Sequence, residues 1–96
     1  MIYVDDMYST EGGKVGRMKM SHMIADTTEE LLDMVDKIGV DRKWVQFAGT
    51  AKEHFDISKS KRMMAVNLGA KEISRRELSS MVVRRRMISL IDNYKI

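Results

Sequence analysis

Residues 26–39 read Asp-Thr-Thr-Glu-Glu-Leu-Leu-Asp-Met-Val-Asp-Lys-Ile-Gly and decide the fold class of the chain. Thr27 followed by Glu30 is a capping-box pattern, which predicts the start of a helix. Apolar residues then recur at the spacing of one helix face: Leu31, Met34, Val35 and Ile38. Gly39 is a natural helix stop. The stretch therefore predicts an amphipathic helix over residues 28–38.

Apolar segments precede this helix. Met1–Val4 predicts a first strand that ends at Asp5-Asp6, and Val15–Ala25 predicts a second strand. The polar, glycine-rich run at residues 9–14 predicts a loop or a hairpin tip between them.

The downstream segments are, in order, an aromatic strand or extended segment at 44–47, a loop at 48–53, a helix at 59–68, a short strand at 70–73 and a helix at 75–92. Ser58 caps the first of these helices, and Gly69 stops it. Ser74 and Glu77 form another capping box. The inward face of the last helix is expected to carry Leu78, Met81, Val82 and Ile88. Alternating strands and helices predict a single α/β domain over residues 1–96, with a short mixed or partly parallel sheet and about three helices.

Composition limits the classes of protein. The chain has 96 residues, 44% of them hydrophobic and 32% charged, so we expect one folded domain with a modest core. Cysteine is absent, which excludes disulfides, thiolate metal sites and a cysteine nucleophile. No apolar run approaches the roughly 18 residues of a membrane span. The acidic pair Asp5-Asp6 follows the start at once, so we expect no secretory signal and a cytoplasmic location.

The start of the helix predicted at 59–68 is a candidate anion site. Unpaired backbone N–H groups and the helix dipole favour negative charge there, and Ser58, Ser60, Lys61 and Arg62 add hydroxyls and cations. A solvated basic turn is the alternative. The chain contains neither a Walker pattern nor Gly-x-Gly-x-x-Gly. Arg84-Arg85-Arg86 falls in a predicted helix, so its side chains fan out and do not form one nucleic-acid-facing stripe.

Both histidines lie near aspartates. His22 precedes Asp26 by four residues, and His54 precedes Asp56 by two. If the strands run parallel, these residues converge with Asp5 on one rim of the sheet. His54, His22 and Asp56 are candidates for acid–base catalysis, although each histidine could equally be structural.

Two histidines and an aspartate could also bind a metal ion, but their spacing matches no named metal motif. We therefore expect neither a metal nor a cofactor. Phe55, which polar residues surround, is the aromatic residue expected to stack on a ligand ring; Trp44 and Phe47 are alternatives.

An ordered set of short motifs resembles a known family. The motifs are Tyr3-Val4-Asp5-Asp6, Gly16-Arg17, Ser21-His22-Met23-Ile24-Ala25-Asp26, Glu30-Leu31, Gly39, His54-Phe55-Asp56, Ser60-Lys61-Arg62 and Gly69-Ala70. Together, over about residues 2–78, they resemble small hypothetical proteins from tailed phages and bacteria that share a domain of unknown function. The resemblance supplies no activity. It implies a phage or bacterial cytosolic setting, which is the host cytoplasm for a phage protein. It also implies recurrent positions at His22, Asp26, His54, Asp56, Lys61 and Arg62.

The leading hypothesis is a phage-type protein that binds an anionic, nucleotide-like small molecule and sequesters a host immune signal. Its expected ligand-binding residues are Asp5, His22, Asp26, His54, Phe55, Asp56, Ser58, Ser60, Lys61 and Arg62. One alternative is a phosphodiesterase or glycosidic-bond hydrolase that acts on such a ligand, and the sequence leaves binding and catalysis open. Another is a regulator that binds nucleic acid or a host protein, with nucleic acid not favoured. A core this small gains from self-association, so we expect a homo-oligomer and no membrane partner.

Overall fold

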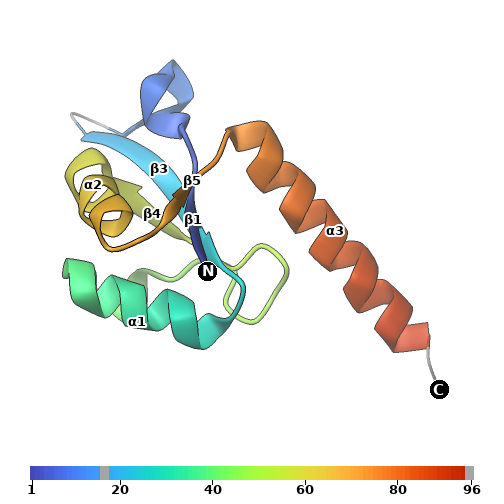
Figure 1. Ribbon diagram of the computed structural model, residues 1–96. Helices are drawn as coiled ribbons and strands as arrows, with labels where there is room; N and C mark the ends of the chain where they lie inside the picture. The colour runs from blue at the N-terminus through green and yellow to red at the C-terminus, as the bar shows by residue number, and fades with distance from the viewer. Residues whose placement is uncertain (16–17, 95–96) are drawn as a thin grey trace.

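The computed structural model describes residues 1–15 and 18–94 (Figure 1). The strands are β1 (Ile2–Val4), β2 (Lys14–Val15), β3 (Met18–Ala25), β4 (Phe55–Ser58) and β5 (Lys71–Glu72). The helices are α1 (Thr28–Ile38), α2 (Lys59–Asn67) and α3 (Arg75–Tyr94). Short 3-10 turns are η1 (Met7–Ser9), η2 (Glu11–Gly13) and η3 (Arg42–Trp44).

The sheet is organised around β3. Met23 pairs with Val4 of β1 and also with Phe55 of β4, so β3 lies between these two strands. Both pairings are antiparallel, as is that of β2 with β3, whereas β1 and β5 run parallel. A mixed sheet with three helices confirms the predicted α/β class.

The core lies on one face of this sheet. α1 and α2 cover that face, and α3 lies on the other side (Figure 1). Val4, Met23 and Phe55 of the three paired strands are fully buried and belong to one cluster with Leu31 of α1 and Ala65 of α2. Since side chains alternate along a strand, the intervening residues of β3 and β4 face α3.

The helix ends follow the capping signals of the sequence. The Thr27 hydroxyl accepts a hydrogen bond from the Glu30 amide (3.2 Å), and Gly39 ends α1 with a φ of 76°, which favours glycine. Ser58 caps α2 by accepting from the Lys61 amide (3.3 Å). A reciprocal pair of hydrogen bonds joins Ser74 and Glu77 at the start of α3. The three predicted helices are thus confirmed to within two residues at each end.

The aromatic segment at 44–47 is not a strand. Trp44 ends η3, Phe47 takes a φ of 54° in a turn, and Gln46 alone makes a single bridge, to His54. The strand in this part of the chain is β4, which lies between the predicted loop at 48–53 and the predicted helix at 59–68. Its partner β3 lies more than 30 residues away, so no local signal identifies the pairing.

The other strand predictions hold in part. β1 matches the predicted first strand, and β5 forms within the predicted 70–73. The predicted strand Val15–Ala25 consists of β3 and the end of β2, and the motif Gly16-Arg17 lies outside the described residues.

α3 is long and only partly packed. Leu78, Met81 and Val82 are half-buried, as predicted, but Ile88 is exposed, contrary to prediction. The helix runs beyond the sheet and makes the molecule elongated, with a longest dimension of 48 Å (Figure 1). Among the described residues, no helix combines the length and apolar character that crossing a membrane requires.

Candidate functional site

Three neighbouring strands align polar side chains on the face opposite to α1 and α2. His22 of β3 is the direct cross-strand partner of Asp56 in β4. Asp5 follows the last residue of β1, and its amide donates to the carbonyl of His22 (3.1 Å). His54 lies two residues before Asp56 and so projects from the same face. Antiparallel pairing, and not the parallel rim expected from the sequence, brings these four residues together.

Asp5 anchors His22. Its carboxylate is 1% exposed and accepts from the Nδ1 of His22 (2.7 Å), the His22 amide (2.9 Å) and the Met7 amide (3.1 Å). Burial acts to raise the pKa of Asp5, but these hydrogen bonds outweigh it, and the pKa lies below its ordinary value. The carboxylate therefore stays ionised at neutral pH. Nδ1 of His22 must carry the proton, which leaves Nε2 as an acceptor.

His54 and Asp56 are fixed in a similar way. The Nδ1 of His54 donates to the carbonyl of Lys52 (2.6 Å), and its Nε2 lies 3.5 Å from Asp56 Oδ1. Gln46 donates to the other oxygen of Asp56, Oδ2 (2.6 Å). The bond to Asp56 raises the pKa of His54 against the effect of burial, and the same bond lowers the pKa of Asp56.

The two imidazoles and Asp56 form a compact cluster. The rings of His22 and His54 meet edge to face with centroids 5.2 Å apart, and the Nε2 of His22 lies 3.7 Å from Asp56 Oδ1. One ligand-type atom from each of the three residues lies within 4.8 Å of the other two. In the described part of the chain these three residues are the group suited to a metal ion; alternatively, they could move protons to and from a bound ligand.

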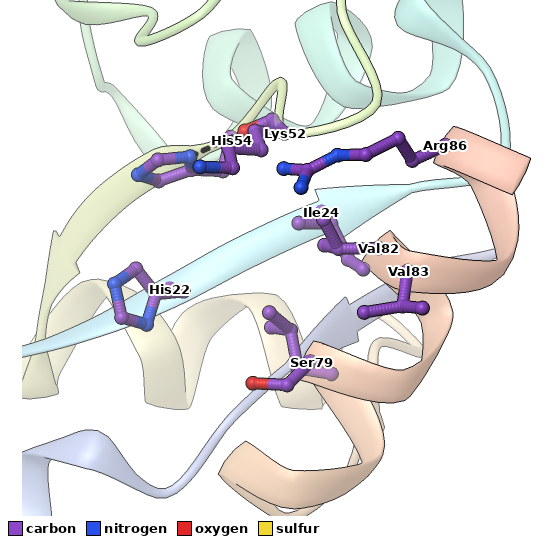
Figure 2. Close-up of a pocket in the computed structure, with 9 residues that line it drawn as sticks. His22, Ile24, Lys52, His54, Ser79, Val82, Val83 and Arg86 are labelled. Atoms are coloured by element: carbon purple, nitrogen blue, oxygen red, sulfur yellow. Dashed lines mark hydrogen bonds between the residues drawn. The ribbon is translucent and has the colours of Figure 1, made fainter. Parts of the chain in front are cut away.

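A cavity of about 300 Å³ opens beside the histidines, between β3 and α3. Figure 2 shows His22 and His54 on the sheet side, with Val82 and Val83 of α3 facing them. Arg86 reaches from α3 toward the loop that carries Lys52 (Figure 2). The cavity thus combines an apolar lining with two imidazoles and two cations, a composition typical of a small-molecule site.

A second hollow of about 500 Å³ adjoins the first, because Lys52 and Arg86 line both. Phe47 lines this second hollow, is 57% exposed and stacks on His54 with ring centroids 6.0 Å apart. Its loop is held by Glu53, which accepts from the Gly49 amide (2.8 Å) and the Thr28 hydroxyl (2.7 Å). The exposed ring of Phe47 is therefore held in the same hollow as Lys52 and Arg86.

Asp26 and Phe55 are among the predicted ligand residues that do not line the cavity. Asp26 is about half exposed and contacts the chain amino terminus, the Tyr3 hydroxyl and Arg85. Phe55 is fully buried in the core, so its ring cannot stack on a ligand, and the prediction for it is wrong. Its position in β4 alternates with His54 and Asp56, which explains why it faces α1 and α2 instead.

The start of α2 is arranged for structure. Ser58 caps the helix, and its hydroxyl also contacts Ser60 (3.2 Å). Lys61 reaches Gly39 at the end of α1. Arg62 is buried, donates to the Asp5 carbonyl (2.8 Å), and pairs with Glu72 (2.9 Å).

Among the described residues that line the cavity, none comes from 58–62. Ser58 thus caps α2 and Arg62 holds the chain at Asp5, and the anion site predicted at this helix start is separate from the cavity.

Sequence reasoning missed Gln46, Lys52 and Arg86. The spacing Ser79, Val82, Val83, Arg86 is that of one helix face and could have indicated that Arg86 points toward the sheet. The three adjacent arginines do fan out as predicted: Arg84 and Arg86 line different hollows, and Arg85 donates to the Ala25 carbonyl. No comparable signal marks Gln46.

Comparison with known proteins identifies the family. The model of the family described as "Protein of unknown function (DUF4031)" matches residues 2–85. The chain belongs to this family. The match includes β1 to β5 and the first half of α3, so it extends beyond the resemblance seen over residues 2–78. No curated protein and no solved structure gives a significant match.

Proposed function

We propose that this protein binds an anionic, nucleotide-like small molecule in the cavity between β3 and α3. The observation that carries the proposal is the position of Lys52 and Arg86, which line both adjoining hollows. Two cations that face a partly apolar cavity leave positive charge available for a ligand. Arginine suits a phosphate group in particular, because its planar guanidinium can donate two parallel hydrogen bonds.

The second hollow supports the nucleotide-like part of the proposal. Phe47 presents an exposed ring there, stacked on His54 and 5.7 Å from the Lys52 ammonium. Stacking of a base on an aromatic side chain contributes about 1–3 kcal/mol. A ligand that places its phosphate between Lys52 and Arg86 could place its ring on Phe47.

Calorimetry on the metal-free chain tests this proposal. The titrants are nucleoside monophosphates, diphosphates and triphosphates, cyclic dinucleotides and, as phosphate-free controls, the nucleosides. We expect saturable binding of at least one phosphorylated ligand and none of its nucleoside. Arg86→Ala should weaken binding by about 10-fold or more, since a hydrogen bond to a charged group contributes about 1.5–3 kcal/mol.

Arg84→Ala is the matched control, because it also removes one arginine charge from α3, while Arg84 lines a different hollow. No binding across the panel would reject the proposal. An Arg84→Ala effect as large as that of Arg86→Ala would reject the cavity as its site.

A second candidate is hydrolysis of the same ligand. The observation that favours it is the buried Asp5 carboxylate, 2.7 Å from the Nδ1 of His22, because this pair resembles a base held and oriented by a carboxylate. After incubation and heat denaturation, chromatography should return altered ligand if the protein is an enzyme. It should return intact ligand if the protein only binds and sequesters it.

A further inference from the structure

The strongest unexplained feature is the convergence of His22, His54 and Asp56 on one point. The Nε2 atoms of His22 and His54 lie 3.7 Å and 3.5 Å from the same oxygen, Asp56 Oδ1. All three side chains are partly exposed, at 30%, 15% and 39%, so the point is accessible from solvent. His22 and His54 also line the cavity.

The hydrogen bonds behind these atoms leave three acceptors facing one another. Nδ1 of His22 donates to Asp5, and Nδ1 of His54 donates to the Lys52 carbonyl, which can only accept. When both rings are neutral, they direct the lone pairs of Nε2 toward the Asp56 carboxylate, and three acceptors at this separation repel one another. Either a proton on one Nε2 or a metal ion between the three atoms relieves that repulsion.

The surrounding contacts are those of a built metal site. Histidines that bind a metal through one nitrogen usually donate from the other to a carboxylate or a backbone carbonyl, and both partners are present here. Gln46 occupies Oδ2 of Asp56, so Oδ1 is the oxygen that faces both imidazoles. Asp5 and Asp56 together balance the charge of a divalent ion.

We propose that His22, His54 and Asp56 bind a divalent transition-metal ion of the zinc type. On a tetrahedral zinc ion, with ligand bonds of about 2.0–2.1 Å, ligand atoms lie about 3.3–3.4 Å apart, close to the two distances to Asp56 Oδ1. Two imidazoles favour such ions over Mg²⁺ or Ca²⁺, which prefer oxygen ligands. Three protein ligands leave a fourth coordination position open, as in catalytic zinc sites.

This inference deepens the proposed function and rests on it for the role of the ion, because the ion would lie beside the proposed ligand. The binding of the ion itself needs no nucleotide. It can therefore be tested independently.

The test is titration of the untagged, EDTA-treated full chain with Zn²⁺ by calorimetry and with Co²⁺ by visible spectroscopy. We expect one equivalent of Zn²⁺ per chain, an intense Co²⁺ spectrum of low coordination number, and no comparable binding of Mg²⁺ or Ca²⁺. His54→Ala and Asp56→Ala should each weaken Zn²⁺ binding by about 100-fold or more.

Asp5→Asn should weaken Zn²⁺ binding by about 10- to 100-fold, as expected for a group that orients a ligand. Its amide also allows the His22 ring to exchange tautomers, which should alter the Co²⁺ spectrum. Asp26 is an exposed carboxylate outside the cluster, so Asp26→Asn is the matched control. Circular dichroism establishes that each variant is folded, and because His54 and Asp56 are partly exposed, their variants are expected to fold.

Absence of saturable Zn²⁺ binding would overturn the inference, as would a full equivalent retained by folded His54→Ala and Asp56→Ala. If the metal-free chain binds a nucleotide and no Zn²⁺, the metal inference fails and the proposed function stands. If the chain binds Zn²⁺ but binds no nucleotide of the panel, whether Zn²⁺ is present or absent, the metal site stands and the proposed function fails.

Discussion

Removal of the Asp5 carboxylate should destabilise the fold more than any other single aspartate change. Asp5→Ala leaves three donors without their partner: the amides of His22 and Met7 and the ring of His22. A buried donor that loses its partner costs about 1–3 kcal/mol. Since the half-exposed His22 ring can reach water, we count the two amides and expect a loss of about 2–6 kcal/mol in the free energy of unfolding.

Urea denaturation in EDTA, followed by circular dichroism, measures this loss. The thermal midpoint should also fall by about 10 °C or more, because 1 kcal/mol corresponds to about 4–8 °C for a domain of this size. Asp26→Ala is the matched control and should cost less than about 1 kcal/mol, since Asp26 is about half exposed and makes only long contacts, to the amino terminus, the Tyr3 hydroxyl and Arg85.

The pH dependence gives a second readout of the same carboxylate. The folded-state pKa of Asp5 lies below its ordinary value of 3.8. Its contribution to stability is therefore fully present above that value and is lost as the pH falls through the folded-state pKa. The wild-type chain should lose stability in acid more steeply than Asp5→Ala. A loss below about 1 kcal/mol at neutral pH, or equal acid slopes, would refute the role assigned to Asp5.

Three further predictions concern other parts of the molecule. The folded-state pKa of His54 is raised, so the contribution of His54 to stability is present below about pH 6.5 and is lost as the pH rises through that pKa. The metal-free wild-type chain should therefore lose more stability than His54→Ala between about pH 6 and pH 9. Parallel stability curves for the two chains would contradict this prediction. Phe55→Ala should cost about 3–5 kcal/mol in urea denaturation, whereas Phe47→Ala should cost less than about 1 kcal/mol, and similar values for both would contradict their assigned positions. We expect the chain to self-associate through Met87 and Leu90, two exposed apolar residues of α3. Light scattering should show a dimer or larger oligomer for the wild-type chain and a monomer for the double variant Met87→Lys/Leu90→Lys. A wild-type monomer at micromolar concentration would contradict this prediction.

Helix positions could be predicted from the sequence because their signals are local. Thr27 with Glu30 and Ser74 with Glu77 determine helix starts within four residues, and Gly39 determines a stop through its own φ. Strand β4 could not be found in this way. Its partner is β3, and the aromatic residues at 44–47 gave a stronger local strand signal, although in the structure only Gln46 of that segment pairs, in a single bridge to His54.

The candidate site was predictable in part for the same reason. The proximity of each histidine to an aspartate in the chain indicated a shared polar site, and Asp5, His22, His54 and Asp56 do meet. Their meeting depends on the antiparallel register of β3 and β4, which the sequence does not show. The cavity could not be predicted, because Arg86 and Lys52 face each other only once α3 packs across the sheet.

We propose that the ligand binds in the cavity under α3 and not at the start of α2. Parallel calorimetric titrations of Arg86→Ala and Lys61→Ala, with the ligand that binds the wild-type chain most tightly, test it most directly. Both variants remove one cation, but Arg86 lines the cavity, whereas Lys61 lies against Gly39. We predict that Arg86→Ala weakens binding by about 10-fold or more, while Lys61→Ala leaves it within about 2-fold of the wild-type value. The reverse order would contradict the account and return the site to the start of α2.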